Sequence, residues 1–134
     1  MRSFFVDTWY LIARFDRFDN HYGVAARLAS RLDGSVFITH DGVLGEFLAF
    51  VAGDGEHNRA ATVAFVRYAM RTYTVLPLDR GLFLRAMNLY DDRRDKAYSL
   101  VDCASMVVMR SEGIQHILTN DHHFAQEGFT LLNA

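Results

Sequence analysis

The feature that most constrains the fold is a set of short, continuous apolar runs separated by longer stretches with helical periodicity. Strands buried on both faces have this appearance, whereas strands with one face in water alternate apolar and polar residues. A chain in which such strands alternate with helices is typical of an α/β domain with a parallel sheet. The runs that we predict to be strands are 4–6, 35–39, 74–76, 116–118 and 129–132.

Helices are expected between these strands. In the stretch 22–32, for example, Ala25, Leu28 and Leu32 recur at the spacing of one helix face, and Gly34 follows as a stop signal. Comparable patterns predict helices up to about residue 14 and over 43–51, 59–71, 82–90 and 100–109. The predicted fold class is therefore α/β: a three-layer α/β/α domain with a central, mainly parallel sheet of about five strands and right-handed crossovers.

The length of the chain and the absence of a linker predict a single domain that spans residues 1–134. The 134 residues suit one domain, and no linker rich in Ser, Gly or Pro divides them, since Pro77 is the only proline. The lone Cys103 excludes an intrachain disulfide and a zinc site built from cysteines. No stretch reaches the ~18 apolar residues of a membrane span, and Asp7 interrupts the first apolar run too early for a signal peptide. We therefore expect a cytoplasmic protein that does not bind a membrane.

Two carboxylates follow predicted strands at the same edge of the predicted sheet. Asp7 closes the first strand and Asp121 lies just beyond the fourth, where parallel α/β sheets bind their ligands. Asp41 and Asp79 follow the second and third strands in the same way. Helix N-capping is the alternative interpretation of all four residues, because aspartate is a strong N-cap.

Two further acids, Glu46 and Asp102, are each the only ionisable residue of an apolar helix. Helices this apolar are expected to be buried on most faces, and a buried carboxylate costs several kcal/mol unless it is paired, hydrogen-bonded or bound to metal. For Asp102 a capping box with Ser99 is an alternative explanation. Glu46 has no such partner, because the residue three positions earlier is Val43.

These four acids could converge on one point, where they would repel one another unless a divalent cation lay among them. Ligands that are all oxygen suit Mg²⁺ or Mn²⁺ rather than zinc, and such a site supports hydrolysis of a phosphate ester. His122 and His123 are adjacent and point apart, so we do not expect them to be ligands.

Other phosphate chemistries of α/β folds fit less well. The chain has no G-x-x-x-x-G-K-[ST] phosphate loop, and no G-x-G-x-x-G follows the first strand. Trp9 stands where a haloacid-dehalogenase-type phosphatase would have its second aspartate, and Cys103 lies in mid-helix with no adjacent base.

Four segments resemble the PIN-domain ribonucleases, and most closely the VapC-type toxins of prokaryotic toxin–antitoxin pairs. They are Phe5-Val6-Asp7-Thr8, Val43-Leu44-Gly45-Glu46, the run from Asp95 to Ser105, and Thr119-Asn120-Asp121-His122-His123-Phe124. The segments stand in the family's order and the resemblance covers nearly the whole chain. Two positions depart mildly from the usual pattern, Tyr98 where tryptophan is common and Val101 where threonine is common.

The resemblance implies an Mg²⁺- or Mn²⁺-dependent endoribonuclease with Asp7, Glu46, Asp102 and Asp121 as catalytic and metal-binding residues. Asp7, Asp102 and Asp121 would be the main ligands, with Glu46 acting through water. Polar residues matching the family's usual helpers are Thr8, Ser99 and Thr119, and Asp95 is either a further site acid or a solvated charge. Implied partners are an RNA substrate, a cognate antitoxin protein and a second copy in a homodimer.

The formal net charge of −2 does not attract RNA, so phosphate groups would have to be bound by a local group of basic residues. Arginine suits that task because its planar fork binds phosphate bidentately, and the candidates are Arg80, Arg85, Arg93 and Arg94 with Lys96. The alternative interpretation of these basic residues is an ordinary solvated surface.

A second set of residues, which is apolar, forms either a dimer surface or part of the core: Phe50, Val51, Phe65, Val66 and Tyr68. The residues alone leave open a metal-dependent phosphatase and a non-catalytic PIN-like RNA-binding module.

Overall fold

The computed structural model describes residues 2–53 and 55–134, and gives no account of the side chains of residues 56 and 57. Five strands form one sheet in the order β3-β2-β1-β4-β5. All four neighbouring pairs are parallel. The strands are β1 (Ser3–Val6), β2 (Val36–His40), β3 (Thr74–Leu76), β4 (His116–Leu118) and β5 (Thr130–Leu132). The predicted α/β class and the parallel sheet are thus confirmed; residues 1 and 54 of the predicted 1–134 domain lie outside the described ranges.

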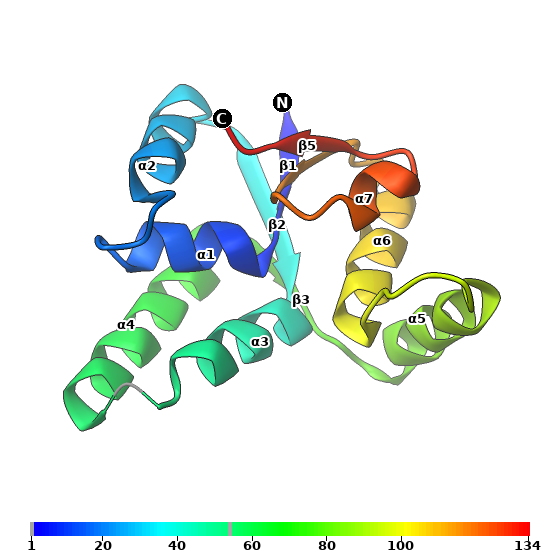
Figure 1. The fold of residues 1–134 in the computed structure, drawn as a ribbon, viewed down its shortest axis with the longest axis horizontal. Coiled ribbons are helices and arrows are strands. Elements are labelled where there is room, and N and C mark those ends of the chain that lie inside the picture. The colour runs from blue at the N-terminus through cyan, green and yellow to red at the C-terminus, as the bar shows by residue number, and fades with distance from the viewer. Residues whose placement is uncertain (1, 54) are drawn as a thin grey trace.

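Helices cover both faces of this sheet (Figure 1). They are α1 (Thr8–Phe15), α2 (Tyr22–Arg31), α3 (Asp41–Val51), α4 (Glu56–Thr72), α5 (Arg80–Asp92), α6 (Leu100–Glu112) and α7 (His123–Gln126). Figure 1 shows α1, α2 and α4 on one side of the strands and α5 and α6 on the other. The short α7 was not predicted. Within the described ranges, none of the helices combines the length and the apolar character that a bilayer crossing requires.

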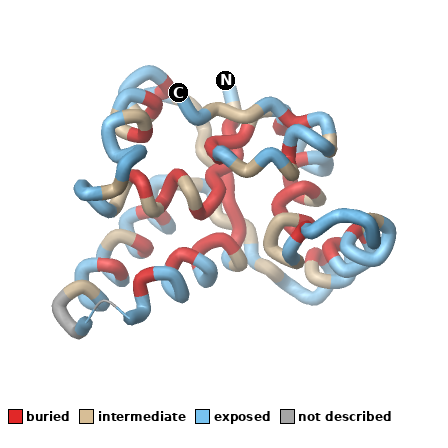
Figure 2. Tube along the Cα trace, in the orientation of Figure 1, coloured by how far each residue is buried: buried red, intermediate tan, exposed pale blue. Residues whose placement is uncertain are grey.

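Strand β1 lies at the centre of the sheet and of the core (Figure 2). Phe4, Phe5 and Val6 have no exposed surface, because neighbouring strands flank β1 and helices pack on both of its faces. A continuous apolar run is what such a two-sided environment selects. The same environment accounts for Ile117 and Leu118 in the adjacent β4, which are also fully buried.

The strand order positions the candidate site. From β1 the chain builds outward through β2 and β3 in one direction and through β4 and β5 in the other. In α/β sheets, ligands bind beyond the carboxyl ends of strands where the order reverses. Val6 pairs with Leu118 in the register, so Asp7 and Thr119 leave the sheet side by side at that position.

Candidate active site

Asp7 sits at the carboxyl end of β1, where its side chain is turned to the neighbouring strand. The Thr119 hydroxyl donates to Asp7 Oδ2 at 2.7 Å. Asp7 stands at the N-cap position of α1, but its side chain makes no capping hydrogen bond. The N-cap interpretation therefore does not account for this carboxylate.

The environment of Asp7 is unfavourable to its charge. Only 6% of the residue is exposed. Burial raises the pKa of Asp7 to about 7, against the lowering effect of hydrogen bonds from Thr119 and from the Thr8 backbone. The nearby charges of Asp102 and Glu46 act in the same direction as burial. Asp7 is thus a carboxyl group that lacks a positive partner.

Glu46 projects from α3 toward the start of α1, where the Thr8 hydroxyl donates to Glu46 Oε1 at 2.5 Å. The expectation that Glu46 is buried was wrong, because the residue is exposed. Some apolar side chains of α3 face the solvent as Glu46 does, and Phe50, for example, is 64% exposed. Thr8 nevertheless links Glu46 to the residue that follows Asp7.

Asp102 occupies the first turn of α6 and forms the predicted capping box with Ser99. Ser99 Oγ accepts from the Asp102 backbone N–H at 3.0 Å, and Asp102 Oδ2 accepts from the Ser99 N–H at 3.0 Å. The capping interpretation is thus confirmed, and it uses only one carboxylate oxygen. Burial raises the pKa of Asp102, and the negative charge of Asp121 adds to the effect.

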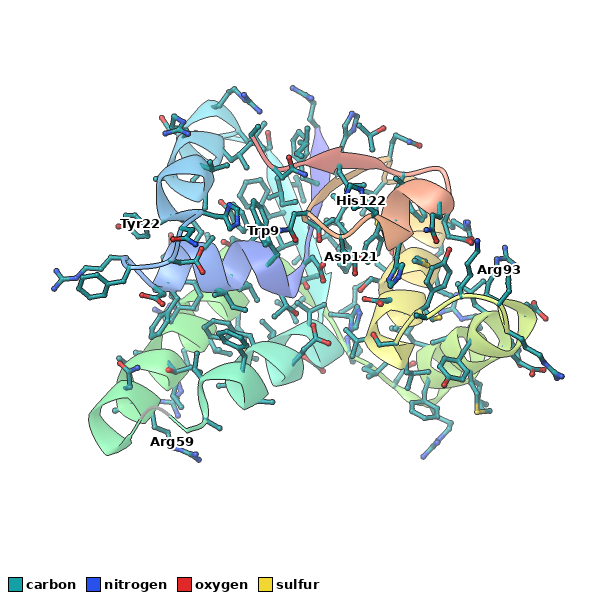
Figure 3. All side chains as sticks on the ribbon, in the orientation of Figure 1. Trp9, Tyr22, Arg59, Arg93, Asp121 and His122 are labelled. Atoms are coloured by element: carbon teal, nitrogen blue, oxygen red, sulfur yellow. The ribbon has the colours of Figure 1, made fainter. Side chains whose placement is uncertain are left out.

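Asp121 lies in the turn that leads from β4 into α7, near the middle of the molecule (Figure 3). Its backbone N–H donates to Thr119 Oγ1 at 3.2 Å, so one hydroxyl contacts both Asp7 and Asp121. Asp121 Oδ1 accepts from the His123 backbone N–H at 2.9 Å. Thr119 and this turn together fix the relative positions of the two strand-end acids.

His123 is a site residue that the sequence did not reveal. Its Nδ1 lies 3.2 Å from Asp121 Oδ1 and 3.8 Å from Asp102 Oδ2. Asp102, Asp121 and His123 can each offer one ligand atom such that these atoms lie within 4.8 Å of one another. The two adjacent histidines do diverge, since His122 is exposed. Sequence spacing could not tell which of them faces the acids.

The other two strand-end aspartates serve helix starts. Asp79 Oδ1 accepts from the Leu82 N–H at 2.9 Å, which is the N-cap of α5. Asp41 lies in the first turn of α3, whose N-cap is the buried His40. The capping interpretation is confirmed for Asp79, and neither residue belongs to the group of potential metal ligands that contains Asp102.

The four candidate acids lie near one another without a strong cationic partner. In the part of the chain that the structure describes, none of Asp7, Glu46, Asp102 and Asp121 forms an ion pair with lysine or arginine. Carboxylate oxygens match the ligands of Mg²⁺ and Mn²⁺ sites. The buried Nδ1 of His123 has no hydrogen-bond partner, as expected for an atom that can bind a cation. The donor set therefore fits a divalent metal ion.

The predicted phosphate-gripping residues are partly engaged elsewhere. Arg93 Nε donates to Glu127 Oε2 at 2.9 Å, which removes Arg93 from the set of free guanidinium groups. Arg94 is 82% exposed and pairs with Asp91 at 2.7 Å. Asp95 is 77% exposed beside Lys96, so it is a solvated charge. Figure 3 shows Arg93 at the α5 side of the molecule, away from Asp121.

Comparison with known proteins identifies the class. Residues 4–129 match the PIN domain family model, and the chain belongs to that family. It is 33% identical over 129 residues to the 23S rRNA-specific endonuclease VapC20 of Mycobacterium tuberculosis, covering 93% of this chain and 94% of that protein. The predicted resemblance to VapC-type PIN domains is confirmed.

Solved structures give the same result. The crystal structure of Mycobacterium tuberculosis VapC20, described as a sarcin-ricin loop cleaving toxin, superposes with a TM-score of 0.84 at 28% identity, over 98% of this chain and 99% of that one. VapBC2 from Rickettsia felis, bound to a promoter DNA fragment, has a TM-score of 0.68 at 11% identity and covers 98% of each chain. The latter likeness concerns the fold alone.

Proposed function

We propose that this protein is a metal-dependent endoribonuclease of the VapC type. Its metal-binding and catalytic residues would be Asp7, Glu46, Asp102 and Asp121. The observation that carries the proposal is the gathering of these acids at one sheet edge without a lysine or arginine partner among the described residues. Repulsion of this kind is relieved when a divalent cation is bound.

Asp7, Asp102 and Asp121 would hold Mg²⁺ or Mn²⁺. When bound, the ion supplies Lewis acidity toward the phosphodiester and toward the water that attacks it. Glu46 is the most exposed of the four acids and would position that water and accept its proton. Hydrolysis would leave a 5′-phosphate and a 3′-hydroxyl.

Hydrogen bonds from neighbouring residues would hold the carboxylates in place for this chemistry. The Thr119 hydroxyl donates to Asp7, the Thr8 hydroxyl donates to Glu46, and the Ser99 backbone N–H donates to Asp102. Such supporting hydrogen bonds fix the orientation of metal ligands, and their loss typically costs about 10–100-fold in metal affinity or activity.

The substrate would be RNA, and 23S rRNA is the RNA to test first, because VapC20 carries that specificity in its name. VapC20 is described as a toxin, and we propose that this protein too is a toxin, that it acts in the cytoplasm and that it binds a cognate antitoxin protein. We place the proposed homodimer contact on α3 and α4, where Phe50, Tyr68 and Met70 are exposed. Val51 and Val66 are buried, so for them the interpretation as core holds.

RNA cleavage by matched variants tests the proposal. The wild type is incubated with Mn²⁺ and either 23S rRNA or p-nitrophenyl phosphate, beside Asp102→Asn and the control Asp92→Asn, an exposed acid at the end of α5. We expect cleavage of rRNA by the wild type and the control, and a loss of more than about 100-fold in Asp102→Asn. Intact RNA with a cleaved small ester would indicate a phosphatase. RNA binding without cleavage of either would indicate a non-catalytic module.

A further inference from the structure

Two contacts hold His123 in place, one made by its backbone and one by its imidazole ring. Its backbone N–H donates to Asp121 Oδ1 at 2.9 Å, which ties the start of α7 to one of the candidate acids. Its ring packs edge-on against Tyr98, with 5.1 Å between the ring centroids. Tyr98 is itself buried, and its hydroxyl is anchored on Glu127 at 2.9 Å. The backbone bond and the packing against Tyr98 together fix the position of the ring.

The atom that this orientation presents to the acids is Nδ1. It lies 3.2 Å from Asp121 Oδ1 and 3.8 Å from Asp102 Oδ2, but it makes no hydrogen bond, although it is shielded from solvent. Buried polar atoms in folded proteins are nearly always partnered. A nitrogen that lies near two carboxylates and lacks a hydrogen-bond partner is placed to bind a cation.

His40, a fully buried histidine at this sheet edge, shows the contrast. His40 Nδ1 accepts from the Gly42 N–H at 3.0 Å, and its Nε2 lies 2.9 Å from Ser105 Oγ. Both ring nitrogens of His40 are thus used by the fold. His123 Nδ1, by contrast, has no hydrogen-bond partner and lies where three potential ligand atoms come within 4.8 Å of one another.

We propose that His123 Nδ1 binds the metal ion directly, beside Asp102 and Asp121, and gives the site a preference for Mn²⁺ over Mg²⁺. The proposal rests on the metal-dependent function proposed above. Mg²⁺ is a hard ion that takes oxygen ligands and keeps its waters. A nitrogen ligand is better tolerated by transition-metal ions, whose affinities for mixed nitrogen and oxygen sites rise along the first row.

Pulsed electron paramagnetic resonance of bound Mn²⁺ tests this directly, because it detects the nuclear spin of a coordinated ¹⁴N. The full chain is loaded with Mn²⁺ and measured with natural histidine and with ¹⁵N-labelled histidine. We expect a ¹⁴N modulation that the label replaces by that of ¹⁵N. The experiment needs no substitution, so its result does not depend on how a variant folds.

Variants then assign the signal. His123→Gln should lose the nitrogen modulation and bind Mn²⁺ about tenfold more weakly by titration calorimetry, with little change in Mg²⁺ affinity. His122→Gln, at the adjacent exposed position, should keep both. Bound Mn²⁺ without any histidine modulation in the wild type would overturn the His123 assignment and leave the metal-dependent nuclease standing. Absence of Mn²⁺ binding by the wild type would overturn both.

Discussion

Asp7 and Glu127 are both buried carboxyl groups, yet their surroundings are opposite. Glu127 has a side chain that is 5% exposed and accepts hydrogen bonds from Arg93, Arg110 and Tyr98. Burial alone would raise the pKa of Glu127, but these donors outweigh it and lower the pKa to about 2. Asp7 has one hydroxyl donor and acidic neighbours, and its pKa rises to about 7.

Under the proposed function, the difference separates a structural acid from a functional one. Around Glu127 the chain itself supplies the positive charge, so the cluster is complete and joins α6, α7 and the loop after α5. Around Asp7 the described part of the chain supplies no lysine or arginine partner, and we propose that a metal ion provides the counter-charge. Proteins commonly give up stability at sites that bind or react. The charged form of Asp7 therefore lowers the stability of the fold, whereas the charged form of Glu127 raises it.

The largest effect on stability is expected for Glu127→Gln. The substitution leaves two guanidinium groups without their carboxylate, and we expect the free energy of unfolding at pH 7 to fall by about 2 kcal/mol. Because the pKa of Glu127 is lowered in the folded state, its contribution is present above about pH 4.5 and is lost as the pH falls toward 2. Urea unfolding between pH 2 and 7 should show a weaker pH dependence in the variant. Equal stability of variant and wild type at pH 7 would remove the contrast with Asp7.

Asp7→Asn should have a smaller effect of the opposite sign. The folded state raises the pKa of Asp7 to about 7, so the penalty for its charge grows from about pH 4 and is complete above pH 7. Without metal at pH 8, the variant should be more stable than the wild type by about 1 kcal/mol. Thermal unfolding in EDTA measures this. Added Mn²⁺ should stabilise only the wild type, and a loss of metal-free stability would make Asp7 a structural acid like Glu127.

The strands could be predicted from sequence because each is a short continuous run of apolar residues. Such a run arises where both faces of a strand are buried. All five predicted strands are present, and 74–76 and 116–118 match to the residue. The parallel topology then brings Asp7 and Asp121 to one edge. The helix α7 was missed because four residues make barely one turn and leave no periodicity to detect.

The remaining features of the site depend on contacts between distant residues. Glu127 binds Arg93 from 34 residues away, and no local pattern distinguishes that arginine from a free one. The exposure of Glu46 depends on how α3 packs, which an apolar composition alone could not reveal. For His123, the direction of the ring is set by Tyr98, and adjacent histidines look equivalent until that packing is known.

Arg94→Ala should have the smallest effect on stability, because Arg94 is an exposed charged residue, whereas Asp7 and the Glu127 side chain are buried. Arg94 is adjacent to Arg93, but it is 82% exposed and its partner Asp91 is 66% exposed. Exposed ion pairs contribute little, so the free energy of unfolding should stay within about 0.5 kcal/mol of the wild type. Since Arg94 remains available to phosphates, RNA binding by a cleavage-deficient protein should weaken. The slope of log Kd against log salt concentration should then decrease by about 1. Unchanged RNA affinity would assign Arg94, like Arg93, to the fold alone, and the phosphate contacts would then have to come from Arg80 or Arg85.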